Sequence, residues 1–123
     1  MKPVNTTLAP AAIGPYSQAA FKNGMLFISG QLGIDPNTGN LAESFEAQSY
    51  LVFNNLKAIL EEEGMSFANA VKVSVFVTNM NNFAALNEIY KQYFSQPFPA
   101  REVIQVAGLP KGGDVEISLI AMK

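Results

Sequence analysis

The chain has 123 residues, of which 49% are apolar and 15% are charged, and its formal net charge is -2. It contains neither histidine nor cysteine, which excludes catalytic pairs built on those residues, ordinary zinc or iron–sulfur ligation, and a disulfide framework. No glycine-rich phosphate loop is present, so neither a dinucleotide site nor a P-loop is indicated.

Length and composition favour one domain over residues 1–123. The first residues lack the apolar segment of a signal peptide, and no apolar run approaches the length of a membrane span. Because there is no basic run, nucleic acid is not an expected partner. We therefore expect a cytoplasmic protein that uses neither a metal ion nor an organic cofactor.

The first predicted element is a β-hairpin. Asn23-Gly24 is a two-residue turn signal between residues 17–22 and the apolar run 25–29. A second turn is predicted at residues 35–40, which are rich in Asp, Asn, Pro and Gly.

A long helix is predicted next, from Ser44 as its N-cap to about Glu63, with Gly64 in the place of a C-terminal cap. Its buried face repeats at helical spacing and consists of Phe45, Ser49, Val52, Phe53, Leu56, Ile59 and Leu60.

The rest of the chain alternates strands and a helix. Alternation predicts a strand whose buried face is Val71, Val73, Val75 and Val77. A second helix is predicted over about 82–94, on Phe83, Leu86, Ile89, Tyr90 and Tyr93, and ended by Pro97 and Pro99. Residues 101–107 and 114–122 are predicted strands. This order, with an optional third strand after the hairpin, predicts an α+β fold in which two helices cover one face of a mixed sheet.

The other face of the predicted sheet is also apolar. Phe76, Ile104, Val106 and Ile120 need covering there, and no helix is left to cover them. The simplest arrangement that buries them is self-association through this face.

Arg101 is the first candidate site residue. It opens a strand directly after Pro99 and Ala100, and proline stiffens the backbone that leads to it. A rigidly placed guanidinium is a good two-pronged receptor for a carboxylate. A surface arginine or an ion pair at a strand end would explain the same residue.

Glu116 is the second candidate. It lies between Val115 and Ile117 in the last strand, so period two places it on the opposite face, beside Ser118 and Ile120. A carboxylate within an apolar strand is costly unless it is paired or functional, and it could position or deprotonate water. An edge-strand charge or a solvent-facing residue is the alternative.

Four further residues are weaker candidates. Tyr16 follows a Gly-Pro turn signal, and its hydroxyl either donates to a ligand or packs near a loop. Ser29-Gly30 ends an apolar strand, where glycine either lets another group approach the backbone or forms a bulge. Asn87 on the second helix either reaches a site or is solvated.

Several segments occur in a characteristic order over essentially the whole chain. They are GPYSQA at 14–19, FISGQLGIDPNTG at 27–39, VFVTNMNNFAALNEIY at 75–90, FPAR at 98–101, VAGLPKG at 106–112 and VEI at 115–117. Together they resemble the reactive-intermediate deaminase A family, RidA or YjgF.

The resemblance implies a chorismate-mutase-like fold and a homotrimer with sites in clefts between adjacent subunits. It also implies hydrolysis of enamine and imine intermediates such as 2-iminobutanoate and 2-iminopropanoate to 2-oxo acids and ammonia. By position, Arg101 matches the arginine that holds the substrate carboxylate, and Glu116 matches the glutamate near the reacting carbon. The matching substrate-binding positions are Tyr16, Ser29, Gly30, Asn87, Arg101 and Val103.

Val103 departs from the family pattern, because it replaces a frequent cysteine and so excludes a thiol role while leaving a backbone contact. Glu102 and Gln105 also differ from common choices. Two other functions remain open: a regulatory trimer that binds 2-oxo acids without turnover, and a holdase-like chaperone. Retention of both Arg101 and Glu116 favours the enzyme.

Overall fold

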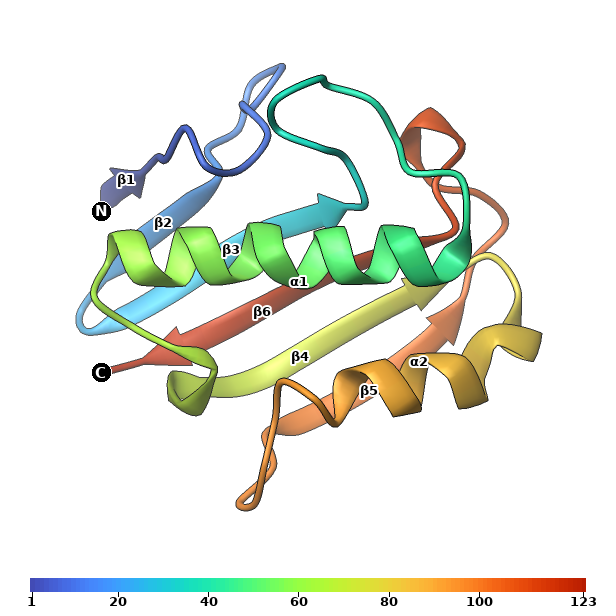
Figure 1. Cartoon of the computed structure of the whole chain (residues 1–123). Coiled ribbons are helices and arrows are strands. Elements are labelled where there is room, and N and C mark those ends of the chain that lie inside the picture. The colour runs from blue at the N-terminus through green and yellow to red at the C-terminus, as the bar shows by residue number, and fades with distance from the viewer.

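A computed structural model describes residues 1–123. It contains one mixed six-stranded sheet with two α-helices on one face (Figure 1), so the predicted architecture is confirmed. The strands are β1 (Lys2–Val4), β2 (Ala19–Lys22), β3 (Met25–Leu32), β4 (Ala70–Val77), β5 (Ala100–Gln105) and β6 (Val115–Met122). The helices are α1 (Phe45–Glu62) and α2 (Phe83–Tyr90), with the 3-10 turns η1 (Phe67–Asn69), η2 (Met80–Asn82) and η3 (Pro110–Gly112). Neither α-helix combines the length and apolar character needed to cross a bilayer.

The strand order decides where the two main candidates lie. The order is β1-β2-β3-β6-β4-β5, and only the β4–β5 pair is parallel. Glu116 therefore lies on the central strand β6, and the edge-strand explanation for it is wrong. Arg101 lies on β5, which is an edge of the sheet.

Helix α1 begins and packs as its sequence pattern predicts. The Ser44 hydroxyl accepts a hydrogen bond from the Ala47 N–H at 3.1 Å, which satisfies one free donor of the first turn. Gly64 has a φ of +70°, the left-handed conformation that ends many helices. Every residue of the predicted apolar face is buried.

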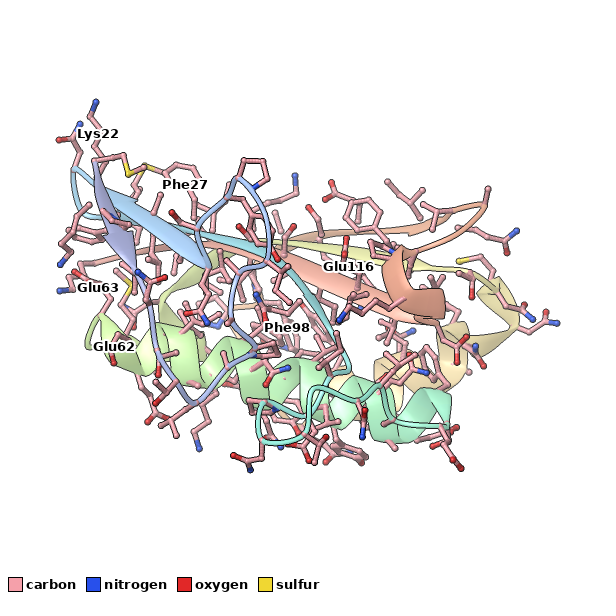
Figure 2. The ribbon with its side chains drawn as sticks, turned by 90° about the horizontal axis from the view of Figure 1, so that it is seen from above. Lys22, Phe27, Glu62, Glu63, Phe98 and Glu116 are labelled. Carbon is pink, nitrogen blue, oxygen red and sulfur yellow. The ribbon has the colours of Figure 1, made fainter.

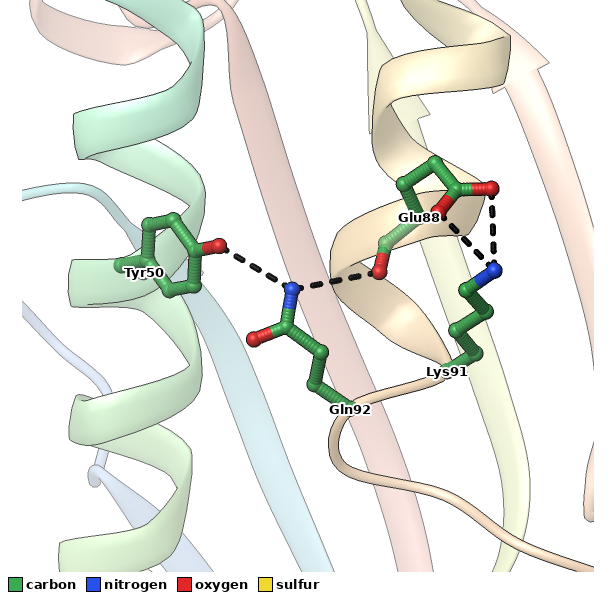
Figure 3. Close-up of polar contacts among 4 residues, drawn as sticks. All are labelled: Tyr50, Glu88, Lys91 and Gln92. Atoms are coloured by element: carbon green, nitrogen blue, oxygen red, sulfur yellow. Dashed lines mark hydrogen bonds and ion pairs between the residues drawn. The ribbon is translucent and has the colours of Figure 1, made fainter.

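An aromatic cluster joins α1 to α2 and to the segment that follows α2. Phe53 stacks on Tyr93 with ring centroids 4.3 Å apart, and Tyr90 stacks on Phe94 at 4.4 Å. A polar link lies nearby, where Gln92 Nε2 donates to the Tyr50 hydroxyl at 3.1 Å and to the Glu88 carbonyl at 3.2 Å (Figure 3). These contacts fix the short helix α2 against the longer one.

Four predictions of local structure need correction. Val71 is 43% exposed rather than buried, because a register shift between Ala70 and Lys72 takes it out of the alternating row. Helix α2 ends at Tyr90 and not near residue 94, because the N–H groups of Gln92 and Tyr93 bond three residues back and tighten the chain into a turn. The strand predicted over 101–107 ends at residue 105. The additional strand is β1 at the N-terminus and not one after the hairpin.

Buried amide side chains on α1 hold the connections at one end of the sheet. Asn55 Nδ2 donates to the carbonyls of Leu32 at 3.3 Å and Ile34 at 3.0 Å. Gln48 Nε2 donates to the Asp114 carboxylate at 3.1 Å, and Gln48 Oε1 accepts from the Asp114 N–H at 2.8 Å. Helix α1 thereby fixes the chain that follows β3 and the residue that precedes β6.

The sheet face opposite the helices is uncovered and apolar. Figure 2 shows Phe27 on this side, and Phe27, Ile104 and Met122 are between 44% and 46% exposed. Exposed apolar side chains grouped on one surface are typical of an interaction site.

We expect Gly33→Ala to destabilise the protein strongly. A Cβ at residue 33 would lie 2.4 Å from the Gln48 Cα. Because that atom belongs to the backbone of α1, the clash could be removed only if the segment that contains residue 33 moved away from the helix. Overpacking of this kind costs ~1–3 kcal/mol. Gly108→Ala is the matched control, since a Cβ there meets nothing within 4 Å. Thermal unfolding should show a clear loss of Tm for the first variant alone, and equal Tm values would contradict the tight contact.

We also expect a homotrimer, because the uncovered apolar face requires a partner and the family resemblance implies this assembly. Light scattering should give three times the chain mass of 13.3 kDa. Ile104→Asp, which places a charge on the uncovered face, should shift the distribution toward monomer. A wild-type chain that stays monomeric at micromolar concentration would rule the assembly out.

Candidate functional site

The predicted site residues fall into two groups on opposite faces of the sheet. Arg101 is paired with Val73, whose side chain is buried on the helix side, so Arg101 faces the helices. Glu116 is paired with Phe76 and faces the uncovered side (Figure 2). One chain therefore does not bring Arg101 and Glu116 together.

Glu116 opens onto a cavity of about 890 Å³ on its side of the sheet. Tyr16, Ser29, Gly30 and Lys111 also line this cavity, so four of the predicted residues, Glu116 included, share it. The connections that enclose it, residues 5–18, 33–44 and 106–114, run along the upper edge of the molecule in Figure 1.

Gly30 makes room for the carboxyl group of Glu116. A Cβ at residue 30 would lie 2.7 Å from the Glu116 Cδ, so any larger residue would displace the carboxylate. The backbone approach predicted for Gly30 is confirmed, and the approaching group is Glu116. Burial raises the pKa of Glu116 above its ordinary carboxylate value, which makes it a better proton acceptor once it is ionised.

Ser29 and Gly30 also form the bulge that was the alternative for Gly30, since the pairing of β3 with β6 shifts between Ile28 and Gln31. The Ser29 hydroxyl donates to the Ser17 carbonyl at 2.6 Å, and the Ser29 N–H donates to the Gln18 carbonyl at 2.9 Å. Ser29 therefore anchors the segment that carries Tyr16, and its Oγ keeps only acceptor capacity for a ligand.

Tyr16 is 54% exposed, which does not fit the packed aromatic that was the alternative. Its ring lies at the cavity wall, in the segment that leads into β2. The hydroxyl is thus available to a ligand.

Arg101 is held by uncharged groups. Its Nη1 donates to the Asn87 Oδ1 at 2.8 Å, and its guanidinium carbon lies 4.7 Å from the ring centroid of Tyr90 and 5.8 Å from that of Phe83. No carboxylate forms a salt bridge with it. The ion-pair explanation for Arg101 is therefore wrong, whereas its exposed position still fits a surface arginine. Asn87 lies beside Arg101 as its hydrogen-bond partner.

Val103 lies two residues further along β5, opposite Val75, and packs against the core. Its side chain is turned away from the cavity on the uncovered face. Since β5 is an edge strand, part of its backbone has no strand partner, which is compatible with the backbone contact expected for Val103.

Three residues that matter for the cavity or for the connections around it were not among the candidates. Lys111 lines the cavity in a left-handed conformation at φ 58°, and it lies within the segment VAGLPKG that supports the family resemblance. Gln18 is buried and its Nε2 donates to the carbonyls of residues 6, 9 and 10, which fixes the cavity's N-terminal wall. Gln48 does not line the cavity but bonds Ala42 and Asp114 in two of the connections around it. It falls on the apolar stripe of α1, three residues after Phe45, and that spacing could have revealed it.

The sequence model of the family described as endoribonuclease L-PSP matches residues 6–123. The chain belongs to this family, RidA/YjgF. A RutC family protein of Aquifex aeolicus (strain VF5) is 47% identical over 125 residues and covers both chains fully. The 2-iminobutanoate/2-iminopropanoate deaminase of Capra hircus is 47% identical over 121 residues, with 98% of this chain and 88% of that protein covered. The human protein of the same name is 45% identical, with the same coverage.

Solved structures of RidA/YjgF proteins share the whole fold. RidA from the Antarctic bacterium Psychrobacter sp. PAMC 21119 superposes with a TM-score of 0.97 at 48% identity, with both chains fully covered. E. coli TdcF with bound serine gives a TM-score of 0.95 at 40% identity, with 100% of this chain and 99% of that one covered.

We expect Glu116→Gln to raise thermal stability at neutral pH. A raised carboxyl pKa means that the folded state holds its proton to higher pH than the unfolded state, so stability falls as pH rises above the ordinary value of 4.5. Glutamine keeps the shape of the glutamate side chain but cannot ionise, so it removes the loss of stability that accompanies ionisation of buried Glu116. The Tm of the variant should exceed that of the wild type at pH 7 and converge with it at pH 4.

The exposed helix residue Glu62 provides the control, because Glu62→Gln should follow the wild type at both pH values. A Glu116→Gln variant less stable than the wild type at pH 7 would mean that ionised Glu116 has a stabilising partner, such as a neighbouring subunit.

Proposed function

We propose that this protein hydrolyses reactive 2-imino acids, 2-iminobutanoate and 2-iminopropanoate among them, to 2-oxo acids and ammonia. The names of its relatives support this substrate class. The geometry supports it through one observation above all: Arg101 and Glu116 are both presented to solvent, but from opposite faces of one sheet.

A site that uses both residues then takes them from two subunits. Arg101 of the edge strand β5 in one subunit meets the cavity of Glu116 in its neighbour, across the apolar face that self-association covers. The assembly thus builds a carboxylate receptor and a base around one cleft, as the family resemblance implies. The domain limits, 1–123, and the homotrimer are part of this proposal.

Each residue has a defined task in the reaction. Arg101 binds the substrate carboxylate through two parallel N–H donors and thereby fixes the C=N carbon in place. Glu116 takes a proton from water as the water oxygen adds to the carbon of the protonated imine and the C=N electrons move to nitrogen, which gives the carbinolamine. The protonated Glu116 then passes its proton to the amine nitrogen. The C–N bond breaks, ammonia leaves with the bonding electrons, and the hydroxyl proton passes to the ionised Glu116 as the 2-oxo group forms; Glu116 then releases this proton to solvent. No group is oxidised or reduced.

A non-catalytic binder of 2-oxo acids is the second candidate function. Serine bound to E. coli TdcF is an amino acid with the same carboxylate handle, and Arg101 alone would suffice to recognise it. Glu116 favours turnover over binding alone, because its carboxyl group is half-buried in the cavity and the missing side chain of Gly30 leaves the space that it occupies. The family description as an endoribonuclease is less well supported, because the net charge is -2 and basic residues form no cluster in the sequence.

We expect Arg101→Lys to keep some carboxylate binding but to lose most turnover, and Arg101→Ala to lose both. An ammonium attracts the carboxylate as a point charge and leaves the substrate free to turn, and a misplacement of ~1 Å costs on the order of 10²-fold in rate. The measurements are ammonia release from freshly generated 2-iminobutanoate and calorimetric binding of 2-oxobutanoate. Near-normal turnover in Arg101→Ala would reject the proposed function.

We expect Glu116→Gln to lower kcat by about 10²–10⁴-fold while 2-oxobutanoate still binds, since the loss falls on proton transfer. Co-expression with Arg101→Ala chains should restore activity. In randomly mixed closed rings, about a quarter of the shared sites combine an intact Arg101 with an intact Glu116. Purified mixed oligomers no more active than either parent would show that the two residues do not share a site between subunits.

A further inference from the structure

Arg101 is the only arginine in the chain. Four salt bridges link lysines to glutamates, and none of them involves Arg101. The one hydrogen bond that its side chain makes goes to a neutral amide, Asn87 Oδ1. A guanidinium has five N–H donors, so the remaining ones are free for a ligand.

The groups that surround Arg101 come from one stripe of α2. Phe83, Asn87 and Tyr90 are spaced four and three residues apart, which places them on the same side of a helix. The guanidinium lies over the ring of Tyr90, and Phe83 is at the outer range of the same kind of contact. Ring faces attract a cation without neutralising it.

Tyr90 itself is rigidly fixed. It is 6% exposed, it stacks on Phe94 at 4.4 Å, and it meets Phe53 edge to face at 6.2 Å. The link from Gln92 to Tyr50 holds the end of the same helix (Figure 3). The ring therefore cannot swing away when Arg101 engages a ligand.

The hydroxyl of Tyr90, unlike its ring, makes no contact that positions Arg101. It is buried and has no hydrogen-bond partner. Burial raises the pKa of this hydroxyl, an effect that the charge of Arg101 partly offsets, so the side chain stays neutral beside the cation. The part of Tyr90 that acts on Arg101 is its ring.

We propose that Tyr90 is a positioning residue for Arg101, whose ring face holds the guanidinium in the orientation that receives a carboxylate and leaves its charge unneutralised. Asn87 acts together with the Tyr90 ring, because its hydrogen bond to Nη1 fixes the rotation of the guanidinium about its long axis. An aspartate at 87 would fit the same space but would pair with Arg101 and compete with the substrate. This inference rests on the proposed role of Arg101 as the carboxylate receptor.

The test is a set of variants with two readouts, 2-oxobutanoate binding by calorimetry and imine hydrolysis. Tyr90→Leu should weaken binding and lower kcat/KM by on the order of 10- to 100-fold, because the guanidinium is no longer held in plane. Tyr90→Phe should restore both to roughly wild-type values. Phe67→Leu is the matched control: Phe67 belongs to the same aromatic cluster, through Phe53, Tyr93 and Phe94, but makes no ring contact with Tyr90 or Arg101. It should therefore lower Tm as Tyr90→Leu does and leave binding unchanged.

A double variant separates positioning from a general loss of structure. In an Arg101→Lys background, Tyr90→Leu should cost less than about threefold in kcat/KM, because an ammonium needs no planar alignment. An equal loss of kcat/KM in both backgrounds, or a loss of binding in Phe67→Leu equal to that in Tyr90→Leu, would overturn the proposal. If the wild type binds 2-oxobutanoate but hydrolyses no imine, the proposed function fails, while the binding series still decides the role of Tyr90.

Discussion

The alternation of side chains along β5 and β6 is the constraint on which the candidate site depends. It turns Arg101 toward α2 and Glu116 toward the uncovered face. No rotamer change within one chain removes that separation, because the sheet lies between the two residues. A single chain thus keeps the two candidate residues apart, and in the proposed assembly the uncovered apolar face is the surface through which subunits bring them together.

Much of the fold could be predicted because its signals are local. Ser44 and Gly64 bracket α1 as caps do, and Asn23-Gly24 marks the hairpin. The face of Glu116 followed from period two alone. The motifs extended these local signals to a family, and hence to Arg101 and Glu116 as a pair.

What could not be predicted depends on contacts between distant segments. The bulge that exposes Val71 arises from pairing with β6, which no local pattern records. Gly30 was expected to admit some group, but that this group is Glu116 depends on the register of β3 with β6. The Tyr90 ring beneath Arg101 was interpreted only as part of an apolar stripe, since α2 and β5 are brought together by the tertiary fold.

An arginine held only by neutral groups does not distinguish a substrate from other small anions. Acetate, formate and citrate offer the same carboxylate to Arg101, and in ordinary buffers they are present at far higher concentrations than a short-lived imine. On the proposed role of Arg101 as the carboxylate receptor, these anions compete with any ligand that Arg101 recognises. Kinetic constants should then depend on the choice of buffer, and we expect weaker competition in amine sulfonate buffers.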